Sequence, residues 1–407
     1  QNKLIPPTLN FSEPPQRSPL PNSPFRVPNT PEEWVRRRPD IPRKAGVSAF
    51  GFGGINAHIL LQEYRSRDKD TVDKELLEIS DTGAIVPAGQ ENRSLIAIVG
   101  MDACFGKLKS MRAFQEAVFN GTSAIGARPE DRWRGVENIV GDQSGNKAHS
   151  GGYIDQFNWN FNEFNIPPAE IPDIIPQHLL MLKTAFSAMQ DAGLPVKQPR
   201  EKMGAIIGID FDYEATDYHL RWMLPEKVHA WNALYKLNLS ETDLQAWLAR
   251  LQEDVGPPLT SNRTQGALAG IIASRVAKAF LLGGPSMVIS AEESSGVKAL
   301  GIAVDALQQN EMDTALVGAV DFAGDIRNLV IRDHSNRYSG QNIVRPFNRE
   351  THGTLPGEGA AALVLKRLED ACREGHKIYA VISGSGCASG GGIDNALDSD
   401  AYLQSLE

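Results

Sequence analysis

The stretch that decides the fold runs from Gly284 to Leu307 and reads GPSMVISAEESSGVKALGIAVDAL. Met287 to Ser290 is a short apolar run typical of a buried strand, and after a tight turn apolar residues recur at helical spacing, at Val297, Leu300, Val304 and Leu307. This pattern predicts a strand, a turn and a helix. The turn then lies at a helix N-terminus, where unpaired N–H groups favour negative charge. Enzymes place an activated thiol or hydroxyl there, but this turn contains Glu292, Glu293, Ser294 and Ser295 and no cysteine.

Composition narrows the class of protein before any other motif is considered. At 407 residues the chain has room for two or three domains, and its 41% hydrophobic content includes no apolar run of 18 residues. We therefore expect no membrane span. A formal charge of −9 disfavours nucleic acid as a partner. Cys104, Cys372 and Cys387 lack metal-ligand spacing, so we expect no metal site and interpret them as buried free thiols of a cytoplasmic protein.

Strand-like and helix-like segments alternate along the chain, with glycine-rich turns between them. Buried strands are expected at 95–99, 203–210, 314–320, 360–365 and 377–383. A long helix is expected from Pro176 to Gly193, because proline suits a first helical turn and glycine suits a helix end. Such alternation predicts an α/β fold with a largely parallel sheet.

The 284–307 segment resembles the active-site segment of β-ketoacyl synthases, the condensing enzymes of fatty acid and polyketide assembly. Both have Gly-Pro, a short strand, a nucleophile position, serines and a helix, and Glu293 falls where the family has its acyl-accepting cysteine. The stretches IAIVGMDACFG (96–106) and RPFNRETHGTLPGEGAAALVLKRLEDA (345–371) are also similar to family motifs. The resemblance implies the thiolase-like fold, a layered α/β/α/β/α unit that works as a dimer. Within the second stretch, we expect Glu358 to hold a glycine turn by hydrogen bonds.

Residues 44–63, KAGVSAFGFGGINAHILLQE, read as a strand, a glycine-rich turn and another strand. Glycines permit a left-handed or closely approaching backbone. With the upstream IPPTLNF and SPFRV motifs, this region resembles the C-terminal end of a ketosynthase. The resemblance makes Gly51, Phe52, Gly53 and Gly54 the acyl-pocket and oxyanion loop of an upstream ketosynthase, with Phe52 over the acyl pocket. We assign His58 a structural role.

These resemblances divide the chain into three parts. Residues 1–64 are the C-terminal end of one ketosynthase domain, 65–93 form a charged, turn-rich linker, and 94–407 are a second ketosynthase-like domain that is C-terminally incomplete. Residues 211–256 depart from the family pattern. Their aromatic residues predict a mainly helical insertion whose aromatics serve a core or an interface.

Glu293 is a poor replacement for a nucleophilic cysteine. Attack of a carboxylate on a thioester would give a high-energy anhydride, and a carboxylate about 4 Å from a malonyl carboxylate is repelled by about 4 kcal/mol at an effective dielectric near 20. The family has a branch without the cysteine, the chain-length factors, which shape the tunnel of an active twin. We therefore expect no complete catalytic site in this chain.

Three functions stay open at this stage. The first is a chain-length-factor partner in a multidomain synthase that elongates acyl chains by decarboxylative condensation, either a polyunsaturated fatty acid synthase or a related polyketide synthase. The second is a malonyl-carrier-protein decarboxylase, in which replacing Glu293 by glutamine would raise activity. The third is a non-catalytic docking or structural module.

The resemblance also implies partners. An acyl carrier protein would supply phosphopantetheine, so no directly bound cofactor is expected. Arg128, Arg132 and Arg134 are candidate contacts for that acidic carrier. The upstream ketosynthase body and a second copy of the chain complete the expected partners.

Overall fold

The computed structural model describes residues 3–50, 55–64, 94–133, 136, 150–156, 164, 166–210, 214–333, 338–339, 343–345, 348, 353–389 and 399–406. The expected linker at 65–93 lies outside the described residues. No helix in the described ranges combines the length and apolar character needed to cross a membrane.

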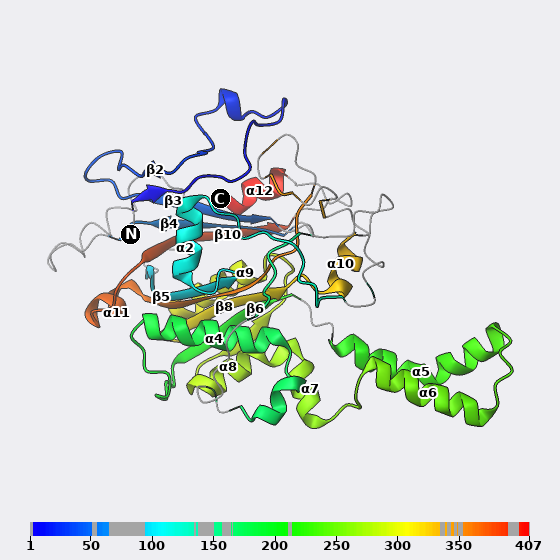
Figure 1. Cartoon of the computed structure of the whole chain (residues 1–407). Helices are drawn as coiled ribbons and strands as arrows, with labels where there is room; N and C mark the ends of the chain where they lie inside the picture. Colours follow the sequence, from blue (N-terminus) through cyan, green and yellow to red (C-terminus); the bar gives the residue numbers. More distant parts are fainter. Residues whose placement is uncertain are drawn as a thin grey trace.

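One sheet of eight strands forms the centre of the described structure (Figure 1). In spatial order its strands are β3 (Lys44–Phe50), β4 (Ile55–Gln62), β10 (Ala380–Ser389), β5 (Ile96–Phe105), β9 (Glu358–Arg367), β8 (Thr314–Phe322), β6 (Met203–Ile209) and β7 (Ser286–Ile289). The expected strands are therefore present, most of them extended by a few residues, although β10 begins three residues later than expected. A separate two-stranded sheet joins β1 (Leu4–Ile5) to β2 (Glu32–Glu33).

The expectation of a largely parallel sheet is wrong. Only β7, β6 and β8 run parallel to one another, because helices connect them in sequence and return the chain to the same end of the sheet. The other strand pairs described in this sheet are antiparallel. Buried strands of both kinds give continuous apolar runs, so the sequence pattern does not distinguish them.

Helices cover both faces of this sheet and create two separate hydrophobic cores. The described helices are α2 (Met111–Asn120), α4 (Pro176–Asp191), α5 (Glu214–Leu234), α6 (Glu241–Val255), α7 (Ser261–Ala267), α8 (Ile272–Phe280), α9 (Ser295–Gln308), α10 (Ile326–Asp333), α11 (Leu368–Arg373) and α12 (Ser399–Leu406). Short 3-10 turns are η1 (Leu20–Asn22), η3 (Pro168–Asp173) and η4 (Ala269–Ile271).

The alternation of side chains along β6 shows how the two cores form. Ile207 packs into the core beneath α4 and α8, whereas Ile206 packs into the core beneath α9. Both side chains are fully buried, as expected for neighbouring residues that point to opposite faces of a strand. The sheet is therefore the middle layer of a three-layer α/β/α unit, which confirms the expected α/β class, while a second sheet layer of the expected α/β/α/β/α unit stays a prediction.

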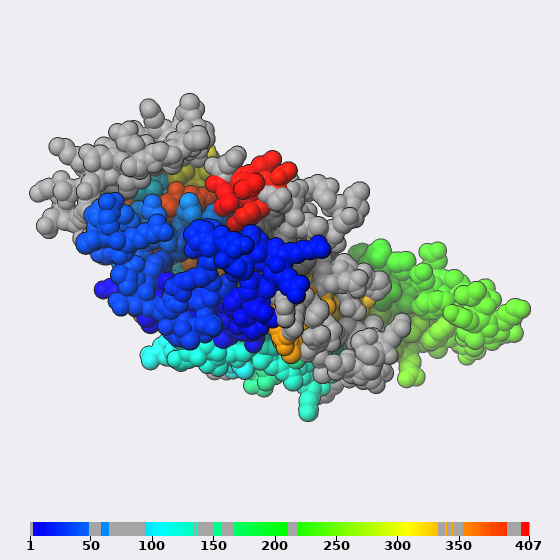
Figure 2. Space-filling view, turned by 90° about the horizontal axis from the view of Figure 1, so that it is seen from above, coloured from blue at the N-terminus to red at the C-terminus, as the bar shows by residue number. Residues whose placement is uncertain are grey.

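The β3–β4 hairpin joins the same sheet as the rest of the chain. β4 pairs with β10 from Ile55 opposite Ser389 to Gln62 opposite Val381. Figure 2 shows the N-terminal segment, in blue, spread over one side of the molecule next to the C-terminal helix α12, in red. Glu63 fixes this segment by accepting hydrogen bonds from Arg36, at 2.8 and 2.9 Å. Whether residues 1–64 belong to a separate ketosynthase stays a prediction.

Helices α5 and α6 form the expected helical insertion, which projects from the body as a hairpin (Figure 1). Trp231 and Trp247 pack together with ring centroids 6.0 Å apart, joining the two helices. Trp222 and Tyr235 are instead 66% and 65% exposed. These two aromatics are therefore not core residues, and an interface role for them stays a prediction.

The cysteine expectation is only partly confirmed. Cys104 is buried on β5, but Cys372 and Cys387 are exposed free thiols. Cys372 lies on the short helix α11, and the hydroxyl of Tyr64 lies 3.3 Å from its Sγ. A short surface helix and a strand near the edge of the sheet leave these side chains open to solvent.

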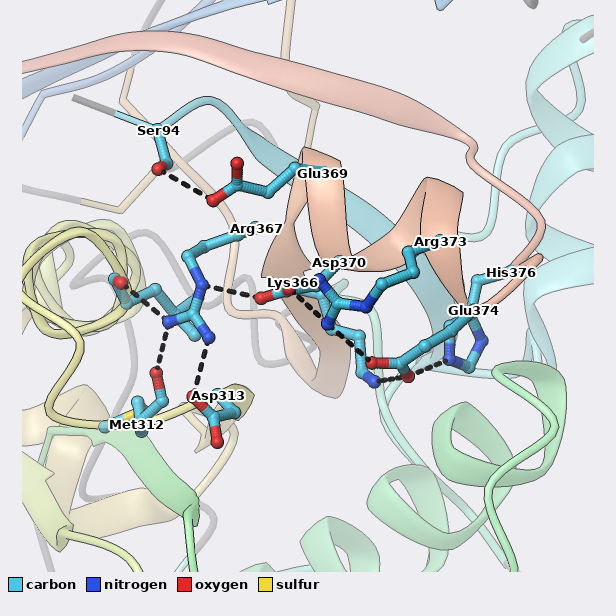
Figure 3. A network of polar contacts seen from close by, with 11 residues as sticks. Ser94, Met312, Asp313, Lys366, Arg367, Glu369, Asp370, Arg373, Glu374 and His376 are labelled. Atoms are coloured by element: carbon cyan, nitrogen blue, oxygen red, sulfur yellow. Dashed lines mark hydrogen bonds and ion pairs between the residues drawn. The ribbon is translucent and has the colours of Figure 1, made fainter. Parts of the chain in front are cut away.

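A cluster of charged side chains around Arg367 lies at the end of the sheet where β8 begins and β9 ends (Figure 3). Arg367, 7% exposed, donates to the carbonyls of Leu307 and Met312, at 3.1 and 2.9 Å. It also forms ion pairs with Asp313 and Asp370, both at 2.6 Å. Nearby, Glu374 pairs with Lys366 and lies 3.2 Å from the His376 ring.

Candidate functional site

The predicted strand, turn and helix are present at the elbow. β7 ends at Ile289 and α9 begins at Ser295. Glu292 takes a left-handed backbone with φ of 47°, which is uncommon for a residue other than glycine. The Ser295 hydroxyl accepts from the Ala291 N–H at 2.9 Å and donates to the Glu292 carbonyl at 2.6 Å, so it holds both sides of the strained residue.

Close packing on β6 fixes the position of the elbow. A Cβ added to Gly208 would lie 2.6 Å from the Ser295 carbonyl carbon and 2.7 Å from the Gly296 nitrogen. Only a residue without a side chain allows the start of α9 to approach the strand so closely. Ser294 is fully buried and Ser295 is 5% exposed, so both serines of the predicted elbow serve its packing.

Glu293 lies in the turn before α9, and its carboxylate forms an ion pair with Arg332 of α10. The Glu293 side chain is 29% exposed, while that of Arg332 is 15% exposed. The expected favourable location at a helix N-terminus is present, but a guanidinium from a distant helix is the charged partner of this carboxylate. The ion pair is therefore partly exposed to solvent beside the turn between β7 and α9.

Arg332 has further partners that fix its orientation. Its Nη2 donates to the Asp210 carboxylate at 2.8 Å, and its Nε donates to Asn328 Oδ1 at 2.9 Å. Asn328 is 4% exposed and is held by its own donation to the Ala323 carbonyl at 2.8 Å. Burial lowers the pKa of Arg332, but the hydrogen bond and charge of Glu293 help raise it above its ordinary value overall. Arg332 is therefore always charged.

Asp321, near the end of β8, adds a further carboxylate to this region. The residue keeps contact with solvent on one side, but the protein packed around its carboxylate disfavours the charged form. This desolvation, together with the charge of Asp210, raises the pKa of Asp321 to about 6. Arg332 opposes the shift. Three carboxylates, on Asp210, Glu293 and Asp321, thus share the neighbourhood of one guanidinium, so the region has an excess of negative charge when all of them are ionised.

Glu358 has a structural role, but its carboxylate bonds the segments at Arg132 and Ile154 rather than the glycine turn. It is 3% exposed, accepts the Ile154 N–H at 2.7 Å, and forms an ion pair with Arg132 at 3.0 Å. Burial raises the pKa of Glu358, although Arg132 and the Ile154 N–H oppose that shift. Glu358 therefore ties three separate segments together.

Two of the three arginines proposed to contact a carrier protein are engaged inside the chain. Arg132 is paired with Glu358, and Arg128 lies over the Trp133 ring at 4.7 Å while donating to the Arg132 carbonyl. Arg128 is engaged by residues close in sequence and Arg132 by the distant Glu358, and these contacts argue against a carrier contact by either residue. Arg134 lies outside the described residues.

The glycine-rich turn Gly51, Phe52, Gly53 and Gly54 lies outside the described residues. Its flanking strands, β3 and β4, lie at the opposite edge of the sheet from β7. His58 on β4 has its Nδ1 2.8 Å from the Ser48 hydroxyl across the hairpin, which is a structural contact.

Within the described residues, no group of three or more His, Cys, Asp or Glu side chains is arranged to hold a metal ion. The predictions that the chain binds no metal and no cofactor directly stay predictions. What this arrangement can do chemically is hold a carboxylate in place against a fixed guanidinium.

Sequence reasoning did not find Asp210, Asn328 or Arg332. One signal was available for Asp210, because it directly follows the buried strand β6 and parallel strands end at the same edge of a sheet. Arg332 gave no comparable signal, since an arginine near the end of a short helix is typical of a solvated surface.

Comparison with known proteins places this geometry in context. The family profile described as "Beta-ketoacyl synthase, N-terminal domain" matches residues 93–371. One of the polyunsaturated fatty acid synthase chains of Thraustochytrium sp. is 29% identical over 401 residues, which is 97% of this chain and 18% of that protein. Polyketide synthase PksL from Bacillus subtilis is 28% identical over 338 residues, covering 80% of this chain and 6% of that protein.

Solved structures agree with these relatives. A structure described as the PfaC ketosynthase and chain length factor is similar with a TM-score of 0.57 and 27% identity, covering 90% of this chain and 37% of that one. The ketosynthase from module 6 of the bacillaene synthase of Bacillus subtilis gives a TM-score of 0.55 and 25% identity, covering 72% and 42%. The chain spans less than a fifth of each of the two curated relatives described above.

Proposed function

This chain belongs to the β-ketoacyl synthase family, with relatives among polyunsaturated fatty acid and polyketide synthases, and from that premise we propose that residues 94–407 act as a non-acylating partner of the chain-length-factor type. The whole synthase would elongate acyl chains by decarboxylative condensation with malonyl carrier protein. The domain would help to shape the tunnel in which an active ketosynthase extends its product.

One observation carries this proposal. The residue at the position of the family's acyl-accepting cysteine, Glu293, is a carboxylate in an ion pair with Arg332. A carboxylate that is engaged by a guanidinium is a weaker nucleophile still, and its acyl product would be an anhydride rather than a stable thioester. The similarity to the PfaC ketosynthase and chain length factor supports the same division of labour.

The partners in this proposal are an acyl carrier protein, which supplies phosphopantetheine, the upstream ketosynthase body, and a second copy of the chain, all in the cytoplasm. Strand β7 at the sheet edge supports dimer formation, because it pairs with β6 on one side and carries Met287, which is 40% exposed. An open edge strand with an apolar side chain is suited to pairing with another chain. Arg128 and Arg132 are not part of the proposed carrier surface.

The test uses hexanoyl and malonyl thioesters together, with a cysteine-containing ketosynthase of the same family as the positive control. The purified chain is expected to form neither the 3-oxooctanoyl condensation product nor acetyl thioester. Condensation would contradict the proposal. Acetyl thioester and CO2 without condensation would favour the decarboxylase alternative, and in that case Glu293→Gln should release more CO2 than the wild-type chain.

A further inference from the structure

Arg332 is held in place by partners other than Glu293. Asp210 binds its Nη2 edge at 2.8 Å and Asn328 binds its Nε at 2.9 Å. These partners lie at the end of β6 and on α10, so they come from two separate elements. With those two sides occupied, the Nη1 group is directed toward the elbow, where it meets Glu293. The guanidinium would thus keep its orientation if the elbow side chain were changed.

The position opposite Nη1 is also open to solvent. Glu293 keeps 29% of its side-chain surface exposed, whereas Asp210 and Arg332 keep 12% and 15%. Glu293 therefore occupies the outer side of the cluster, and a small solute could reach the same place. The planar edge of a guanidinium recognises a carboxylate with good geometry.

Charge balance decides which solute fits there. Asp210 and the nearby Asp321 already supply negative charge around Arg332, so an additional anion beside Glu293 would be repelled. If Glu293 loses its charge, however, one external carboxylate restores the original balance without adding to it. The position therefore suits a ligand with a single carboxylate, and it is closed to that ligand while Glu293 is present.

We infer that Arg332 forms a carboxylate-binding position at the elbow and that Glu293 fills it from within the chain, which makes the elbow reject ligands bearing a carboxylate. Under the proposed function, the carboxylate ligand that reaches the elbow is a malonyl group. Only this identification of the ligand rests on the proposed function. Glu293 is then a specificity-determining residue rather than an inert replacement.

The experiment uses malonamate, which has one carboxylate and one neutral carbonyl as a malonyl thioester does, and malonamide as its uncharged counterpart. Binding is measured by isothermal titration calorimetry to the wild-type chain and to Glu293→Ala, with Glu292→Ala as the matched control from the same turn. We expect Glu293→Ala to bind malonamate at least tenfold more tightly than the wild-type chain or Glu292→Ala, and to bind malonamide no better than they do.

The double variant Glu293→Ala with Arg332→Met identifies the binding group and is expected to lose the gained affinity. Equal malonamate affinity of wild type and Glu293→Ala, or undiminished affinity of the double variant, would overturn the inference. If circular dichroism shows that Glu293→Ala is unfolded, Glu293→Gln is used instead. Its neutral amide has the shape of the glutamate side chain, and the carboxylate of malonamate can displace that amide from Arg332. These results do not depend on thioester chemistry, so a failure here is distinct from a failure of the proposed function.

Discussion

Helix α9 has an arginine cluster near each end, and the two clusters differ in their partners. Near its C-terminus, Arg367 pairs with the carboxylates of Asp313 and Asp370 and also donates to the backbone carbonyls of Leu307 and Met312. A cation there also complements the helix dipole. Near its N-terminus, Arg332 binds the side chains of Asp210, Asn328 and Glu293.

This difference separates stability from specificity. The Arg367 cluster joins strand ends to helices, and its central pair, Arg367 and Asp370, is nearly closed to water, so its main effect is on folding. The Arg332 cluster depends on the choice of particular side chains around an open position, so a single substitution can change what it binds. The predictions below test that contrast.

The largest expected effect comes from Arg367→Met. It leaves the largely buried Asp370 and two carbonyls without a major donor, and removing one partner from a buried ion pair costs about 3–5 kcal/mol. Urea unfolding should show this loss. Arg373→Met is the matched control, because Arg373 also pairs with Asp370 but is 67% exposed and should cost less than about 1 kcal/mol. Equal losses in the two variants would refute the distinction between them.

Arg332→Met should have a smaller effect on folding, of about 1–3 kcal/mol, because it removes charge-assisted hydrogen bonds at a partly open position. Combining it with Glu293→Gln should recover part of the loss, since the second change removes a carboxylate left without its cation. A double-mutant cycle from unfolding curves measures this coupling. Strictly additive losses would show that the two side chains do not interact.

The elbow region should become more stable on mild acidification. Folded Asp321 has its pKa raised to about 6, while an unfolded aspartate titrates near 3.9. The folded state therefore binds more protons between those values, and stability falls as pH rises from about 4 to 6. Asp321→Asn should flatten this part of the curve. Unfolding free energies measured from pH 7 down to pH 4.5 check it, and an unchanged slope would contradict the assignment.

The Arg367 end should respond to acid in the opposite direction. Burial raises the pKa of Asp370, but hydrogen bonds from Arg373 and Arg367 outweigh it and lower the pKa overall. Its contribution is thus present above about pH 4 and is lost at lower pH. Asp370→Asn should reduce the loss of stability below pH 4, and thermal melts at pH 4, 3.5 and 3 measure this. A steeper loss in the variant would contradict the prediction.

Sequence reasoning recovered the elements near the elbow but not the charges around them. The spacing of Val297, Leu300, Val304 and Leu307 predicts α9 because local periodicity determines a helix face. Strand direction was misjudged because buried parallel and antiparallel strands have the same apolar pattern. The Glu293 and Arg332 pair was missed because its residues lie 39 positions apart and meet only through tertiary packing.

Arg132, one of the arginines expected to contact a carrier protein, illustrates the same point. Arg132 pairs with Glu358, 226 positions away, so its charge is used within the fold. Local sequence shows where charges are, but only the packed structure shows which of them stay available to a partner.

The most direct test of the account is the acylation of Glu293→Cys beside the wild-type chain. Each protein is incubated with hexanoyl thioester and mapped by peptide mass spectrometry. Glu292→Cys is the control for the position of the cysteine within the turn. Acylation of the exposed Cys372 and Cys387 is measured separately on their own peptides. We expect an acyl adduct on the elbow peptide of Glu293→Cys, less in Glu292→Cys, and none in the wild-type chain. An adduct on Glu293 itself would contradict the claim that this elbow is non-acylating.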